Sequence, residues 1–198
     1  MKQHQISDIF ELLGPPRVTH EPSPSDWYAL EQQLGIELPR DYKRFASRYA
    51  PIQVNGHLYF NHPTTSRWNL GDWMEVTVNE FRRGDFAQAD CPGFDDGVTF
   101  GGPDGLIPLI DSDSGDYLFG AWESKDEAWR FLACNGDEQN FYEYRMPFPE
   151  WIYRYLAGED MLGPNSGVFS PGPIMLESMP MNPEERSDTW YGPERNSS

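Results

Sequence analysis

The spacing of apolar residues changes near residue 50, and this change restricts the fold class more than any other feature. Before it, apolar residues recur three or four positions apart, as in helices that bury one face. After it, short apolar runs flank Asn55-Gly56, the dipeptide most typical of a two-residue β-hairpin. Residues 147–156 return to helical spacing. This order predicts an α+β fold, with helices packed on one face of a mostly antiparallel sheet.

Three helices are predicted in the first fifty residues. The first covers residues 6–13 and ends where glycine and two prolines follow. The second begins at Ser23, a residue type that caps helices, and ends at Gly35. The third begins near Pro39. Its apolar face carries Tyr42, Phe45 and Tyr49. We expect Trp27 of the second helix and Tyr42 to be core residues.

Later segments are predicted as strands, with one ambiguous stretch. Residues 69–81 suit a helix capped by Asp72, but Val76-Thr77-Val78 also suits a strand. Residues 84–105 are rich in glycine and predict a loop. The apolar runs that predict strands are residues 52–54, 57–60, 106–110, 117–122, 129–134 and 139–144.

The domain organisation follows from where proline and glycine accumulate. Residues 1–161 are predicted to form one domain, and residues 162–198 a C-terminal extension rich in both residue types. Within the extension, residues 168–169 and 174–176 can dock on the domain as an extended arm. The last fifteen residues are expected to be flexible.

The charge of the chain limits the partners that it can bind. Thirty-two acidic residues against fifteen basic ones give a formal net charge of −17 at pH 7. Such a chain repels phosphate backbones and anionic membranes, so no direct nucleic-acid or membrane binding is expected. It attracts basic proteins instead. The N-terminus has no signal-peptide pattern, which predicts a cytoplasmic protein with Cys91 and Cys134 buried and reduced.

The sequence signatures of common enzyme classes are missing. There is no GxSxG serine motif, no phosphate-binding GxxxxGK[ST] loop and no HExxH metal motif. The turn of residues 111–116 departs from a calcium-binding EF-hand loop, and its alternation of Asp and Ser is typical of a hairpin turn. His57 and His62 have too few neighbouring ligands for zinc and are expected to be surface residues. We expect no catalytic residue, no metal and no cofactor.

The acidic residues are concentrated in one span that has no base. Residues 84–124 contain no Lys or Arg, and aromatic residues are interleaved with the acids. Acids around apolar anchors are typical of a surface that binds a basic protein. The candidate partner-binding residues are Asp85, Asp90, Phe94, Asp95, Asp96, Asp111, Asp113 and Asp116. The alternatives are a solvated acidic loop followed by core strands, or carboxylates that serve an enzyme.

Three stretches together resemble a known family. Residues 27–31 lead to residues 34–45, which carry the sequence LGIELPRDY. Residues 106–110 lead to a Ser-Gly-Asp turn and an aromatic strand in residues 114–119, and residues 141–156 form a strand and the closing helix. The combination resembles the SUKH superfamily in its Smi/Knr branch, over a core of residues 27–156. The resemblance implies a SUKH-like fold.

The resemblance also implies a class of function. Bacterial members of this superfamily bind and neutralise a toxin domain, often a nuclease or a deaminase, and no catalytic residues are implied. An acidic chain fits an inhibitor that occludes a basic toxin. Fungal relatives regulate cell-wall synthesis, so an intracellular scaffold or regulator without a toxin is the alternative. An enzyme with an acidic carboxylate site is a third alternative. The oligomeric state stays open.

Overall fold

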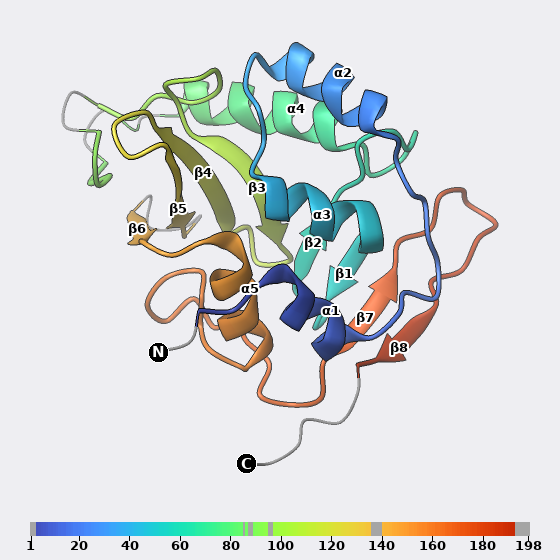
Figure 1. Ribbon diagram of the computed structural model, residues 1–198. Helices are drawn as coiled ribbons and strands as arrows, with labels where there is room; N and C mark the ends of the chain where they lie inside the picture. Colours follow the sequence, from blue (N-terminus) through green and yellow to red (C-terminus); the bar gives the residue numbers. More distant parts are fainter. Residues whose placement is uncertain (1–2, 85, 87–88, 95–96, 136–139, 193–198) are drawn as a thin grey trace.

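The computed structural model describes residues 3–84, 86, 89–94, 97–135 and 140–192 (Figure 1). The helices in this part of the chain are α1 (Ile6–Leu13), α2 (Pro24–Leu34), α3 (Arg40–Tyr49), α4 (Leu70–Arg83) and α5 (Phe148–Leu156). The strands are β1 (Ile52–Val54), β2 (Leu58–Phe60), β3 (Ile107–Ser112), β4 (Tyr117–Glu123), β5 (Ala128–Cys134), β6 (Phe141–Tyr144), β7 (Met175–Ser178) and β8 (Thr189–Tyr191).

The described strands form one sheet in the order β6-β5-β4-β3-β2-β1-β7-β8. Every neighbouring pair in this order runs antiparallel. The predicted hairpin is confirmed, since Asn55 and Gly56 both have positive φ and join β1 to β2. The α+β fold class predicted from the sequence is therefore confirmed.

Local capping signals explain where the helices begin. The Ser23 hydroxyl accepts the backbone N–H of Asp26, whose carboxylate accepts the N–H of Ser23, so the predicted start of α2 is confirmed. The ambiguous stretch is a helix, but its cap is Asn69 rather than Asp72. The Asn69 side chain accepts the backbone N–H of Asp72 at 3.0 Å. α4 buries Leu70, Met74, Val78 and Phe81 on one stripe.

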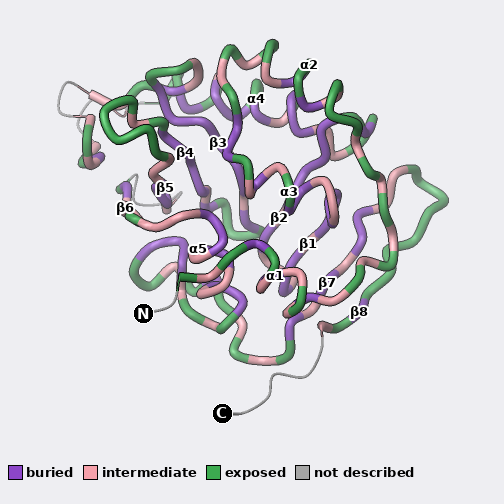
Figure 2. Tube along the Cα trace, viewed as in Figure 1, coloured by how far each residue is buried: buried purple, intermediate pink, exposed green. Residues whose placement is uncertain are grey.

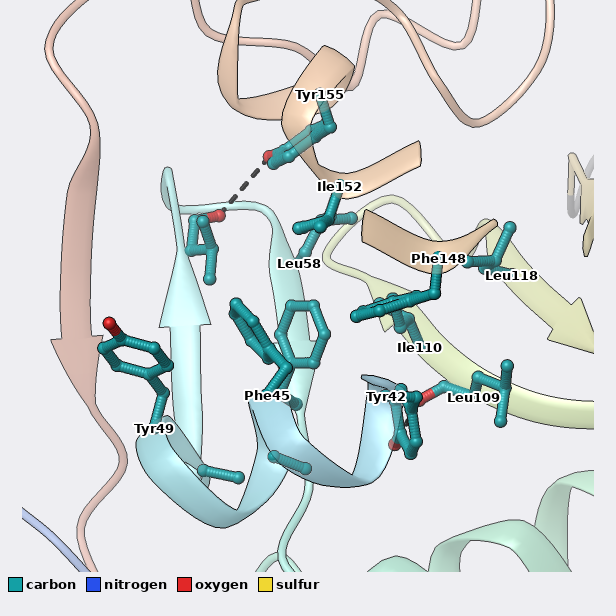
Figure 3. Close-up of a cluster of buried hydrophobic side chains, with 14 of the residues drawn as sticks. Tyr42, Phe45, Tyr49, Leu58, Leu109, Ile110, Leu118, Phe148, Ile152 and Tyr155 are labelled. Carbon is teal, nitrogen blue, oxygen red and sulfur yellow. Dashed lines mark hydrogen bonds between the residues drawn. The ribbon is translucent and has the colours of Figure 1, made fainter. Parts of the chain in front are cut away.

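The main core lies between the sheet and the helices α1, α3 and α5 (Figure 1, Figure 3). Phe45 of α3 is fully buried, with its ring centroid 4.6 Å from that of Phe60 and 6.0 Å from that of Phe148. The hydroxyl of Tyr42 donates to the Leu109 carbonyl at 2.8 Å. Tyr42 and Trp27 are both buried, as predicted.

A smaller core covers the other face of the sheet at β4, β5 and β6. Because side chains alternate along a strand, Leu118 belongs to the main core and Phe119 to the smaller one. Phe81 at the end of α4 packs on Phe119 with ring centroids 5.0 Å apart. Cys91 and Cys134 lie in this cluster as buried free thiols, as predicted.

The same face of the sheet is open over β1, β2, β7 and β8. The inward residues of these strands are buried, whereas the alternate residues are half-buried or exposed (Figure 2). We call this surface, with its continuation on β3, the open face. Its residues are Gln53, Tyr59, Asp111, Met175, Glu177, Thr189 and Tyr191.

The chain after Leu162 contributes β7 and β8 to the sheet. β7 pairs with β1, and Leu176 and Trp190 are buried in the main core. β8 falls within the last fifteen residues, which the sequence predicts to be flexible, and residues 193–198 lie outside the described residues. The division into a domain of residues 1–161 and an extension of residues 162–198 stays a prediction.

Candidate partner-binding surface

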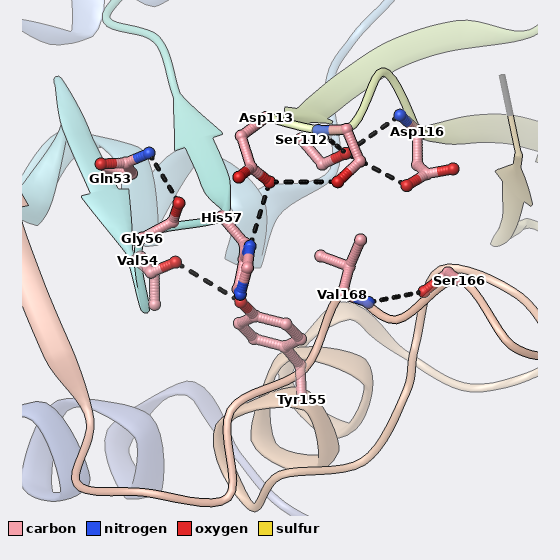
Figure 4. Close-up of polar contacts among 11 residues, drawn as sticks. Gln53, Val54, Gly56, His57, Ser112, Asp113, Asp116, Tyr155, Ser166 and Val168 are labelled. Atoms are coloured by element: carbon pink, nitrogen blue, oxygen red, sulfur yellow. Dashed lines mark hydrogen bonds and ion pairs between the residues drawn. The ribbon is translucent and has the colours of Figure 1, made fainter.

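Two tight turns meet at one end of the sheet, next to the open face. The β1–β2 turn and the β3–β4 turn are neighbours because β2 pairs with β3, with Leu58 opposite Ser112. α5 closes this end, where the hydroxyl of Tyr155 donates to the Val54 carbonyl (Figure 4). The acidic residues of the β3–β4 turn are therefore held on a rigid base of two hairpins and a helix.

The β3–β4 turn is built around Ser112 and Asp116. The Ser112 hydroxyl accepts the backbone N–H groups of Ser114 and Asp116, and it donates to the Asp116 carboxylate at 3.2 Å. This confirms the predicted hairpin turn with side-chain bonds to the backbone. Asp116 is only 3% exposed. A partner cannot reach its carboxylate, so Asp116 is not a contact residue. It stabilises the turn through its bonds to Ser112.

Asp113 projects from the same turn and is accessible. Its side chain is 38% exposed, and its Oδ1 lies 3.0 Å from Nδ1 of His57. The backbone N–H of Asp113 also donates to the His57 carbonyl at 3.0 Å. These two contacts fix the direction of the Asp113 carboxylate, so that it is presented to a partner without reorganisation (Figure 4).

A continuous row of polar residues crosses the open face. In the strand register Glu177 lies opposite Gln53, Gln53 opposite Tyr59, and Tyr59 opposite Asp111. Partial burial and then the carboxylates of Asp113, Asp111 and Glu177 raise the pKa of the Tyr59 hydroxyl. Tyr59 therefore lies among three acidic side chains, two from β3 and the turn after it and one from β7.

Asp111 differs from its neighbours because it is largely buried. Burial raises the pKa of its carboxyl to about 7, while its own backbone and the indole of Trp73 act in the opposite direction. Tyr59 and Tyr117 flank it on the adjacent strands. Near neutral pH the carboxyl is thus divided between its neutral and charged forms, and its contribution to the negative field of the open face grows as pH rises.

The remaining candidates do not gather with the β3–β4 turn. Asp90 is exposed, and its carbonyl accepts the N–H of Phe141 on β6, three strands from Asp111. The Phe94 ring is half-buried against the smaller core, 6.0 Å from the Arg130 guanidinium. Asp85, Asp95 and Asp96 lie outside the described residues. Of the candidates within the described residues, the structure brings together Asp111, Asp113 and Asp116.

Sequence reasoning missed the aromatic and acidic residues that complete this surface. Tyr59 and Glu177 were not among the candidates, although they lie beside Asp111 and Asp113. Their alternation with buried residues in β2 and β7 was the available signal. No Lys or Arg occurs in β1, β2, β3, β7 or β8. The open face thus carries carboxylates and tyrosines, a composition that suits a basic protein surface.

The histidines give no metal site in the described part of the chain. His62 was expected at the surface, but it is buried, and its Nε2 bonds to the His20 carbonyl. Burial lowers its pKa. Over the described residues, no group of three His, Cys, Asp or Glu side chains is arranged to hold a metal ion. None of the helices in these residues is long and apolar enough to span a membrane.

Comparison with models of known protein families shows which family this chain belongs to. The model of the SMI1 / KNR4 family (SUKH-1) matches residues 21–154, about two thirds of the chain. This chain belongs to the SMI1 / KNR4 family. The resemblance to the SUKH superfamily seen in the sequence is thereby confirmed. Comparisons with curated proteins and with solved structures find no match.

The family match covers only part of the surface described above. It runs from just before α2 into α5, so it includes β1, β2 and β3 with Tyr59, Asp111 and Asp113. α1, β7 and β8 lie outside it. In this SMI1 / KNR4 family member, the strands beyond the match extend the open face and add Glu177 and Tyr191 to it.

Proposed function

We propose that this protein is a cytoplasmic, non-catalytic immunity protein that binds a basic toxin domain and neutralises it by occlusion. The observation that carries the proposal is the open face: a SUKH-type sheet presents Tyr59 among the carboxylates of Asp111, Asp113 and Glu177. The SUKH superfamily includes immunity proteins of toxin systems. An acidic surface with aromatic anchors matches the basic clefts of toxins that act on nucleic acids.

Charge and shape support binding over catalysis at this surface. The open face is a broad sheet surface, and Asp113 is held by His57 at its rim. Tyr59 and the exposed Tyr191 supply apolar area with few rotatable bonds, which is typical of residues that dominate interfaces. The net charge of −17 speeds the encounter with a cationic partner.

Reversing two charges of the open face should abolish neutralisation. We expect the double variant Asp113→Lys/Glu177→Lys to bind the toxin ~100-fold more weakly. Each introduced lysine would face the basic surface of the toxin, so repulsion replaces an attraction. The measurement is growth of cells that co-express the variant with a toxin domain encoded beside its gene. Wild-type protein should restore growth and the double variant should not.

A matched control separates this surface from net charge. Glu75→Lys/Glu80→Lys makes the same change in charge on the exposed side of α4. This control should still restore growth. Neither variant alters a buried residue, so both should have the circular dichroism spectrum and the thermal unfolding of the wild type. These two measurements check that the variants are folded. If the open-face variant restores growth, or if both variants lose the ability to restore growth to the same extent, the open face is not the binding surface.

A further inference from the structure

A groove on the helical side of the molecule has the opposite chemistry to the open face. It runs between α2 and α3 and has a volume of about 930 Å³. α3 lies between α1 and α2 (Figure 1). Phe10 of α1 also lines the groove, together with Trp27 and Tyr28 of α2. The indole of Trp27 donates to the Ser47 hydroxyl at 2.8 Å, which ties the two walls together.

One wall of the groove is a basic stripe. Four of the fifteen basic residues of the chain follow one face of α3, at positions 40, 43, 44 and 48, and all four line the groove. Lys43 is neutralised by Glu31, whose Oε1 lies 2.5 Å from its Nζ. Arg44 has an exposed ion pair with Asp41 at 3.4 Å, and exposed pairs of this kind add little to stability.

The other wall offers apolar contacts that are open to solvent. Tyr28 is 64% exposed, and the guanidinium of Arg48 lies 4.8 Å from the centroid of the Phe10 ring. Nε of Arg48 is buried and has no hydrogen-bond partner within the described residues. Guanidinium groups arranged beside aromatic rings suit a ligand that carries both carboxylates and an apolar side chain.

We infer that the groove between α2 and α3 binds an acidic segment of a second protein that also carries an aromatic or aliphatic side chain. Charge complementarity selects this occupant, because four basic residues and two acidic ones line the groove, and one of these acids, Glu31, is already paired with Lys43. The negative charge of the rest of the chain acts weakly here, since exposed charges more than about 8 Å apart are screened at physiological salt. This site is separate from the open face and independent of toxin binding.

Short labelled peptides test the inference on the full-length protein. The first peptide has ten residues, mainly Glu and Asp around a central Phe-Leu pair. In the second, Ser replaces Phe and Leu, and in the third, Lys replaces the acids. Fluorescence anisotropy at low and high salt should show saturable binding of the first peptide that weakens with salt. The second should bind at least tenfold more weakly, and the third should not bind.

Variants place the binding in the groove. Arg40→Glu/Arg44→Glu should weaken binding of the first peptide at least tenfold, which is about 1.4 kcal/mol. The control Arg83→Glu/Arg186→Glu, at two exposed positions elsewhere, should bind as the wild type does. The inference is overturned if the first peptide does not bind, if the third binds equally, or if the groove variant retains full affinity. Preferential binding of a ten-nucleotide single-stranded DNA would overturn it as well.

Discussion

Replacing Phe45 by alanine should lower the free energy of unfolding by about 3–5 kcal/mol, a large part of the stability of a domain of this size. Phe45 is fully buried at the centre of an aromatic cluster with Phe60, Phe148 and Tyr49. The ring links α3 to β2 and to α5 (Figure 3). Alanine would leave a cavity that these rigid rings fill poorly. Urea denaturation followed by tryptophan fluorescence measures the loss.

An exposed aromatic residue provides the comparison for Phe45. Tyr28 on α2 is 64% exposed, so Tyr28→Ala should change the unfolding free energy by less than about 0.5 kcal/mol. If Phe45→Ala costs no more than Tyr28→Ala, the core does not depend on the α3 cluster as described. The denaturant slope should stay the same in both variants, because neither changes the surface exposed on unfolding by much.

Replacing Asp111 by asparagine should stabilise the protein at alkaline pH. The pKa of Asp111 is about 7 in the fold against an ordinary value of 3.8, so the folded state holds more protons than the unfolded state between these pH values. The contribution of Asp111 to the free energy of unfolding therefore falls as pH rises from about 4 to 7, and it does not recover above pH 7. With about 1.4 kcal/mol per pKa unit, Asp111→Asn should gain up to about 4 kcal/mol at pH 8.

The difference between variant and wild type isolates Asp111 from the other carboxylates. Urea denaturation at pH 4, 6 and 8 should show similar stabilities at pH 4 and a growing advantage of the variant toward pH 8. Trp73→Phe should steepen the wild-type pH dependence, since the indole of Trp73 lowers the Asp111 pKa. A constant difference between Asp111→Asn and wild type across this range would contradict the burial of this carboxyl.

Local signals made the first half of the fold predictable. Ser23, Gly35 and the Asn55-Gly56 turn act within a few residues of their position, so the sequence alone predicts α2 and the β1–β2 hairpin. α4 was ambiguous because Val76 and Val78 favour strands. Asn69 and the buried stripe of the helix decide the outcome, and Val76 lies exposed on the outer side.

The surface could not be predicted because it depends on pairing between distant segments. Asp111 and Asp113 were candidates from their acidic span alone. Their neighbour Tyr59 comes from β2, which pairs with β3, and Glu177 comes from β7, which joins the sheet beyond β2 and β1. Asp116 has the same residue type and the same turn as Asp113, yet it is buried and bonded to Ser112. Residue type alone does not separate a carboxylate that holds a turn from one that faces a partner.

Titration of the purified protein against a candidate toxin domain, chosen from the genes beside its own, tests the proposed function most directly. Binding and toxin activity should be measured in the same samples. We predict saturable binding, with toxin activity falling in proportion to the fraction bound and returning with Asp113→Lys/Glu177→Lys. Absence of binding at micromolar concentrations, or a complex in which the toxin keeps its activity, would contradict neutralisation by occlusion.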